Sequence, residues 1–287
     1  MRKYTIFDNS FDMGKNSHIE WTHHTFNPWW GCEKVSPACL HCYAESWAKR
    51  VGSDVWGKSS PRRFFTNEHW KEPHRWNAEA EKAGERRRVF CASMADVFEA
   101  RTDLDKSRVR LWELIEATPS LDWLLLTKRP QHVTKMAPWG KDWPINIWLG
   151  TTVENQVWAN KRLPHLLRTG AKIKFLSCEP LLGPLDLSDY VGNSSGSEIN
   201  WVIAGGESGP NSRPMNPKWL RTLRDFCRNK RIAFHFKQWG HWVPRELLTQ
   251  DQKKVIMVGD VEMAAAGKKL AGRFLDGRTW DEFPISA

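Results

Sequence analysis

Three cysteines, Cys32, Cys39 and Cys42, fall within eleven residues of one another in this 287-residue chain. Thiolate sulfur binds zinc ions and the iron of iron–sulfur clusters. A structural zinc ion normally takes four protein ligands, whereas a cubane cluster held by three cysteines leaves one iron free for a further ligand. The three thiols therefore predict a metal centre, and their spacing alone does not distinguish a zinc ion from an iron–sulfur cluster.

The residues around the cysteines predict a helix. Ser36 followed by Pro37 is a helix-start signal, since serine caps free N–H groups and proline suits the first helical position. Cys39 and Cys42 would then share one face of its first turn, and Cys32 would approach from the preceding loop. The positive end of the helix dipole would favour thiolates at this point.

Two other uses of these cysteines are consistent with the spacing. On zinc, His23 or His24 would supply the fourth ligand. Without a metal, Cys39 and Cys42 would form a C-x-x-C redox pair. The scattered cysteines are expected in the core, because free cysteine is often fully buried: Cys91, Cys178 and Cys227.

Seven short apolar runs, separated by segments long enough for a helix, predict the fold. They span residues 19–26, 88–93, 121–127, 145–152, 172–177, 200–206 and 231–237. Helical patterns over residues 107–117, 155–168 and 217–229 lie between them. This alternation predicts an α/β fold with a parallel sheet, and we favour a partial or full (β/α) barrel over an open doubly wound sheet.

Polar side chains follow most of the apolar runs. In a barrel the carboxyl ends of all strands meet at one mouth, where active sites assemble. The cysteines follow the first run and would join this mouth. The candidate site residues at the strand ends are Ser93, Asp96, Lys128, Thr151, Glu154, Glu179, Glu207 and Lys237.

The alternation stops after the last apolar run. Two short hairpins are predicted beyond it, turning at residues 259–260 and 276–277. We therefore predict a barrel over residues 1–239 and a small C-terminal β-hairpin appendage over residues 240–287, packed on the barrel.

The composition points to the kind of partner. Lysine and arginine outnumber aspartate and glutamate by 43 to 33, which favours partners rich in phosphate or carboxylate. Eighteen tryptophans beside basic segments would suit a groove for single-stranded or flipped-out nucleic acid. The sequence has no apolar run of about 20 residues and no apolar signal-peptide core, so we expect a cytoplasmic protein.

A resemblance to known proteins covers most of the chain. The blocks NPWWGCEKVSPACLHCYAE, SMADVF, LTKRP, GTTVEN, EPLLGP, GGESGP, KQWG and LDGRTWDEFP occur in order. They resemble the signatures of an uncharacterised family of phage and bacterial three-cysteine proteins that are similar to radical SAM (S-adenosyl-L-methionine) enzymes. The cysteine spacing is C-x6-C-x2-C, which departs from the C-x3-C-x2-C that is commonest in that superfamily.

The resemblance implies a cofactor site. Cys32, Cys39 and Cys42 would hold a 4Fe–4S cluster, and His41 occupies the aromatic position that packs near the adenine of SAM. The other residues expected around the cofactor are Tyr43, Ser93, Asp96, Lys128, Thr151 and Glu154. Catalytic residues are not defined by the resemblance, and the candidates are Glu179, Glu207 and Lys237.

The same resemblance implies an enzyme that generates a 5′-deoxyadenosyl radical. The basic charge and the tryptophans favour a nucleic-acid base or nucleotide as substrate, in modification or repair. DNA or RNA is then the expected partner, together with an electron donor such as a flavodoxin or ferredoxin. The alternative is a zinc-dependent nucleic-acid-binding protein without catalysis, which would bind DNA or RNA in a salt-sensitive way.

Overall fold

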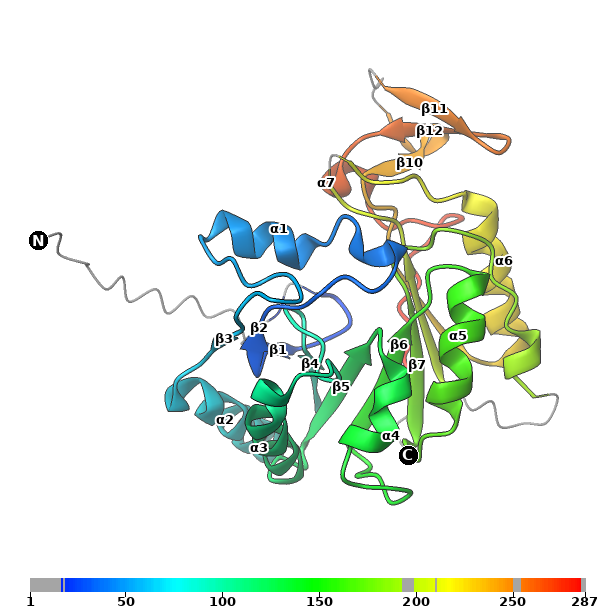
Figure 1. The fold of residues 1–287 in the computed structure, drawn as a ribbon. Coiled ribbons are helices and arrows are strands. Elements are labelled where there is room, and N and C mark those ends of the chain that lie inside the picture. Colours follow the sequence, from blue (N-terminus) through cyan, green and yellow to red (C-terminus); the bar gives the residue numbers. More distant parts are fainter. Residues whose placement is uncertain (1–16, 18, 193–198, 210, 250–253, 285–287) are drawn as a thin grey trace, which may run out of the picture.

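The computed structural model describes residues 17, 19–192, 199–209, 211–249 and 254–284. Its centre is a seven-stranded sheet in which every neighbouring pair is parallel, in the order β1-β4-β5-β6-β7-β8-β9 (Figure 1). The strands are β1 (His24–Phe26), β4 (Arg87–Cys91), β5 (Leu121–Thr127), β6 (Ile147–Thr152), β7 (Ile173–Cys178), β8 (Trp201–Gly205) and β9 (Ala233–Gln238).

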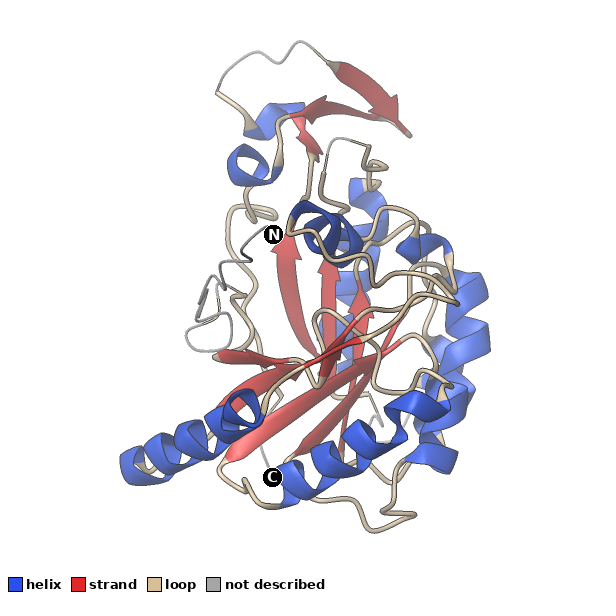
Figure 2. Cartoon of the chain, turned by 60° about the vertical axis from the view of Figure 1, so that its left-hand side comes forward, coloured by secondary structure: helices blue, strands red, loops and turns tan. Residues whose placement is uncertain are grey.

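All seven predicted strands are confirmed. They follow one another across the sheet in chain order, and β1 and β9 form its two edges, so the sheet curls into an open, partial barrel (Figure 2). The α/β class is therefore confirmed, and the partial form of the barrel is the one observed. Two residues on either side of the cysteine segment pair in a separate ribbon, β2 (Trp29–Trp30) with β3 (Arg63–Phe64).

Helices cover the outer face of the sheet (Figures 1 and 2). The α-helices are α1 (Tyr43–Arg50), α2 (Asn67–Ala83), α3 (Asp105–Glu116), α4 (Val133–Met136), α5 (Gln156–Leu167), α6 (Pro217–Lys230) and α7 (Lys268–Ala271). The 3₁₀ turns are η1 (Pro37–Cys39), η2 (Thr102–Leu104), η3 (Pro130–His132), η4 (Ser188–Tyr190) and η5 (Arg245–Leu247). The three helices predicted between the apolar runs correspond to α3, α5 and α6.

The inner face of the barrel is packed with large rings. The side chains of this inner cluster are Trp21, Phe90, Leu124, Trp148, Ile173, Phe175, Trp201 and Ile203. The packing leaves no room for a side chain at Gly150, where a Cβ atom would lie 2.4 Å from the Phe175 ring. Several of the eighteen tryptophans are thus core residues, because a ring of that size fills the barrel.

The C-terminal part is only in part the pair of hairpins expected from the sequence. Strands β10 (Trp242–Pro244), β11 (Val255–Val258) and β12 (Val261–Ala265) form an antiparallel sheet, with the predicted turn at residues 259–260. The second predicted turn, at residues 276–277, is also present and is closed by an antiparallel bridge between Leu275 and Arg278, but its arms do not extend into strands, and the chain then runs antiparallel to β9. The domain boundary at residues 239–240 stays a prediction.

The reason for this difference is an unfilled sheet edge. Phe236 N donates to Trp280 O over 2.9 Å, and Glu282 N donates to Phe234 O over 3.2 Å. Pairing the main-chain groups of the β9 edge stabilises the chain more than longer arms of the second hairpin would.

Among the described residues, no helix is both long and apolar enough to cross a membrane.

We predict that Gly206→Ala destabilises the junction of β8 and β9. A Cβ atom at Gly206 would lie 1.9 Å from Trp239 O, whereas one at the neighbouring Gly205 would lie 3.3 Å from Gln238 O. The free energy of unfolding should fall by about 1–3 kcal/mol, measured by chemical denaturation. Gly205→Ala is the control, and an equal loss in both variants would contradict the steric explanation.

Candidate functional site

A cavity of about 410 Å³ lies at the carboxyl ends of the strands, where the cysteine segment crosses the barrel mouth. It collects most of the site residues that the sequence predicted. The predicted residues that line it are Cys32, Cys39, His41, Cys42, Tyr43, Ser93, Asp96, Lys128, Glu179, Glu207 and Lys237. Thr151 and Glu154 are not among its lining residues.

The cysteine segment differs from the predicted helix. Pro37–Cys39 form a 3₁₀ turn, and α1 begins only at Tyr43, so Cys39 and Cys42 do not share a helical face. Cys42 is the N-cap residue of α1, with an extended backbone (ψ 119°), and the Ser36 side chain makes no capping hydrogen bond. Tertiary contacts of this segment outweigh its local helix preference.

A tight turn at Gly31 begins the cysteine segment. Its φ is +116°, and a Cβ atom there would lie 2.3 Å from Val55 O, so only glycine fits. Gly31 N donates to Met94 O over 3.0 Å, and Gly57 N donates to Cys32 O over 2.9 Å. The first cysteine is therefore held between the loop after β4 and the loop after α1.

The loop after α1 is itself held by a buried ion pair. Arg62 Nη2 donates to Glu99 Oε1 over 2.6 Å, and both side chains are almost fully buried. Arg62 Nη1 also donates to Val55 O and Gly57 O. The Arg62 guanidinium fixes the loop that contacts Cys32, so it influences the position of Cys32 indirectly, through that loop.

A second buried arginine, Arg129 after β5, contacts the cysteine segment directly. Its Nη1 lies 2.9 Å from Asp96 Oδ2 and 3.6 Å from Cys32 Sγ, and its Nη2 donates to Glu33 O over 3.1 Å. Burial alone would raise the pKa of Asp96, but the charge of Arg129 and a hydrogen bond from Thr127 hold that pKa below its ordinary value. Asp96 is thus an anion that orients Arg129.

A third charged contact, made by Glu207 after β8, holds His41 of the cysteine segment. Glu207, after β8, accepts from Arg213 and lies 3.0 Å from His41 Nδ1. Burial would raise the pKa of Glu207, but the hydrogen bonds from Arg213 and His41 outweigh it and lower that pKa. His41 is therefore held towards β8, which accounts for the break between the 3₁₀ turn and α1.

The remaining polar group joins β7 and β9. Lys237 Nζ lies 2.8 Å from Glu179 Oε2, and Gln238 Nε2 donates to Glu179 Oε1 over 3.1 Å and to Ser208 Oγ over 2.8 Å. All four side chains line the cavity. They form a polar patch joined by hydrogen bonds, in which Gln238 Oε1 is buried without a hydrogen-bond partner among the residues that the structure describes.

Glu154 and Thr151 have other contacts. Glu154 is fully buried, pairs with Arg162 over 2.7 Å and accepts a hydrogen bond from Ala38 N at 3.4 Å. Thr151 Oγ1 donates to Thr127 O over 2.9 Å. Glu154 thus holds the 3₁₀ turn beside Cys39, and Thr151 links β6 to β5. Tyr43 is exposed at the rim, and its hydroxyl donates to Ser93 O over 3.0 Å.

The donor set fits a cluster held by three cysteines. Cys32, Cys39 and Cys42 are free thiols from one segment and open onto one cavity. Burial raises the pKa of Cys32 to about 12, against the charge of Arg129, so a metal would have to displace its proton. In the described part of the chain, no three cysteine, histidine or acidic side chains already stand at metal-binding distances.

The histidines that would complete a zinc site lie elsewhere. His23 Nδ1 accepts from Arg88 N over 2.8 Å. His24 is buried and stacks on Trp76, with ring centroids 4.5 Å apart. Neither histidine lines the cavity that contains the cysteines, so this structure offers no support for either as the fourth ligand.

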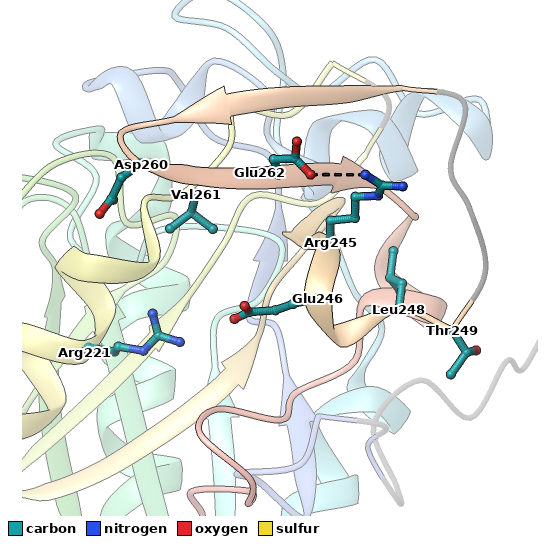
Figure 3. Close-up of a pocket in the computed structure, with 8 residues that line it drawn as sticks. All are labelled: Arg221, Arg245, Glu246, Leu248, Thr249, Asp260, Val261 and Glu262. Atoms are coloured by element: carbon teal, nitrogen blue, oxygen red, sulfur yellow. Dashed lines mark hydrogen bonds and ion pairs between the residues drawn. The ribbon is translucent and has the colours of Figure 1, made fainter.

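A second hollow, of about 660 Å³, lies between α6 and the C-terminal sheet (Figure 3). Figure 3 shows that its side chains are of mixed charge, and Arg245 pairs with Glu262 across 3.2 Å. The lining residues are Arg221, Arg245, Glu246, Leu248, Thr249, Asp260, Val261 and Glu262. It includes none of the cysteines or strand-end candidates.

Fold and site together define an α/β partial barrel with a three-cysteine cavity at its mouth. Residues 16–284 match the family described as "Protein of unknown function (DUF5131)", and the chain belongs to this family. The match does not mention phage proteins. No curated protein matches the sequence.

Solved structures of spore photoproduct lyase are similar to the chain. A double mutant with bound AdoMet and dinucleoside spore photoproduct has a TM-score of 0.45 and 13% identity, over 90% of this chain and 72% of that one. A second mutant has a TM-score of 0.46 and 13% identity, over 88% and 71%.

We predict that Arg129→Gln destabilises the protein by about 3–5 kcal/mol, because it leaves the Asp96 carboxylate buried without its counter-charge. The contribution of Asp96 to the pH dependence of the free energy of unfolding should change sign. In the wild type the lowered pKa of Asp96 gives stability that is present above the unfolded pKa of about 3.9 and is lost as the pH falls. In the variant the pKa should rise, so stability should decrease with increasing pH.

Urea denaturation between about pH 3 and pH 7 measures both effects. Lys71→Gln is the control, because Lys71 and Glu68 form an exposed pair and its loss should have no measurable effect. Unchanged stability of Arg129→Gln would contradict the role assigned to this pair.

Proposed function

We propose that this protein is a radical SAM enzyme in which Cys32, Cys39 and Cys42 hold a 4Fe–4S cluster. The observation that carries the proposal is that three thiols from one short segment line a single cavity at the carboxyl ends of the barrel strands. Three protein ligands would leave one iron of such a cluster free to bind SAM. When bound and reduced, the cluster supplies the electron for cleavage of SAM.

The cavity offers groups for the polar ends of SAM. Asp96 is a buried anion that would face the amino group, and Lys128 is a cation that would face either the SAM carboxylate or a phosphate of the substrate. Ser93 lies beside Tyr43 at the rim. Arg129 balances the negative charge of the sulfur ligands, since it contacts Cys32 Sγ. Thr151 and Glu154 would support the walls of the site from behind.

The side of the cavity formed by β7 to β9 is left for the substrate. Glu179 and Lys237 are held in an ion pair there, and Glu207 is fixed by Arg213. These groups would position a substrate and exchange protons with it. A nucleic-acid base or nucleotide is the substrate class that the charge of +10 and the exposed rings at the rim support. The electron would come from a flavodoxin or ferredoxin.

We predict that Cys32→Ala, Cys39→Ala and Cys42→Ala each abolish iron binding and SAM cleavage. The protein is purified without oxygen, and iron, zinc and the formation of 5′-deoxyadenosine under reducing conditions are measured. Cys227→Ala is the matched control, because Cys227 is a buried thiol of α6 that lies outside the cavity. It should keep the iron content of the wild type.

The spectrum of the reduced wild-type protein provides an independent test. A cluster with a free iron position should give a paramagnetic signal that changes when SAM is added. A wild-type protein that binds zinc and no iron after anaerobic reconstitution would overturn the proposal.

A further inference from the structure

We propose that Lys128 and Lys268 form a phosphate-binding pair at the rim of the cysteine cavity. The ligand would then be a phosphate-bearing molecule, and we argue for a nucleic-acid strand. The inference rests on the proposed function only in taking this cavity as the substrate site. It assigns a role in that site to α7, which belongs to the C-terminal part of the chain.

The charges that line the cavity are mostly neutralised within the protein. Asp96 pairs with Arg129, and Glu179 pairs with Lys237. Glu207 pairs with an arginine outside the lining set, Arg213. Each of these three carboxylates therefore has a cation within the protein.

The two proposed lysines differ from these groups. Among the described residues, neither Lys128 nor Lys268 has an ion pair, and both line the cavity. Two further carboxylates also line it: Glu33 lies 3.8 Å from Arg129, and Glu20 is exposed to solvent, where its charge is screened. Lys34 also lines the cavity but pairs with Glu45 over 2.9 Å, so Lys128 and Lys268 are the lining lysines that remain for an anionic ligand.

The backbone on both sides of the cavity is held in place. Lys128 N donates to Asp96 Oδ2 over 3.0 Å, which fixes this residue at the end of β5. On the other side, Ala266 N and Gly267 N both donate to His241 O over 3.0 Å. The segment that leads into Lys268 is therefore part of the site and not a loose tail.

These contacts connect α7 to the barrel. Trp239 N donates to Gly272 O over 3.1 Å, and His241 N donates to Glu207 O over 2.9 Å. The same residue, Glu207, presents its carboxylate to the cavity. Figure 1 shows α7 above the barrel mouth, next to β10 and β12. The C-terminal part thus contributes Lys268 to the lining of the cavity.

A phosphate suits this rim better than a neutral ligand. Lysine ammonium groups are compact charges that bind phosphate oxygens without needing a planar, two-point geometry. Tyr43 and Trp56 also line the cavity and offer rings on which a base can stack. Cations beside stacking rings are the combination that holds a single strand, and one base of that strand could enter the cavity.

The test is the binding of a fluorescein-labelled single-stranded DNA oligonucleotide to the full-length protein, followed by anisotropy at several salt concentrations. The variant is Lys128→Gln/Lys268→Gln. The control is Lys82→Gln/Lys106→Gln, which removes the same charge from exposed helical positions that do not line the cavity. A strand of the same sequence with uncharged methylphosphonate links separates phosphate contacts from base contacts.

Each phosphate contact makes the slope of log affinity against log salt more negative by about 0.7 for a single strand. The slope of the rim variant should therefore be less steep than that of the wild type by about 1.4, and the slope of the control should be unchanged. The rim variant should bind the uncharged strand as the wild type does. Competition by the unlabelled strand, but not by a deoxynucleoside monophosphate, identifies a nucleic acid, and competition by both identifies a free nucleotide.

The proposal is overturned if the rim variant and the control have the same affinity and salt slope. Iron content and SAM cleavage of the wild type are measured on the same preparation. A protein without iron whose DNA binding still depends on the two lysines would refute the proposed function and leave the phosphate pair intact. A protein that cleaves SAM but whose DNA binding does not depend on the two lysines would refute the phosphate pair and leave the proposed function intact.

Discussion

The buried pair of Asp96 and Arg129 is the interaction on which the site depends. A guanidinium that is almost fully removed from water needs a counter-charge and hydrogen-bond acceptors. Asp96 supplies the charge: its Oδ2 and the sulfur of Cys32 both lie against Nη1, and the carbonyl of Glu33 accepts from Nη2. The ends of two central strands and the cysteine segment are therefore joined at one cation, so the first cysteine has a defined place before any metal arrives.

The other polar contacts repeat this arrangement around the mouth. His41 is tied to Glu207 on β8, and the loop after α1 is tied through Arg62 to Glu99. The cysteine segment thus has few contacts of its own secondary structure and many with strand ends far away in the sequence. Such a segment can adopt an irregular path that brings three thiols to one cavity, because the barrel determines its conformation.

The sequence predicted the strands well because each is buried on both faces and appears as a continuous apolar run. It also predicted that most polar strand ends face one cavity, since parallel strands share a carboxyl edge. It failed where the partner is distant. His41 contacts Glu207, and the helix expected to begin at Pro37 is interrupted there. Glu154 pairs with Arg162 and does not line the cavity. The block LTKRP contains Arg129, but nothing local indicates that its guanidinium reaches Cys32.

The antiparallel contact of residues 280–282 with β9 also bears on how the sheet is completed during synthesis. The other strand pairs join segments that leave the ribosome in order, so the sheet can grow from β1 towards β9. The outer edge of β9 must wait for a segment made well after it, and until then its main-chain groups are open to strands of other molecules. The order of synthesis thus makes β9 the part of a nascent chain that most needs protection from mispairing.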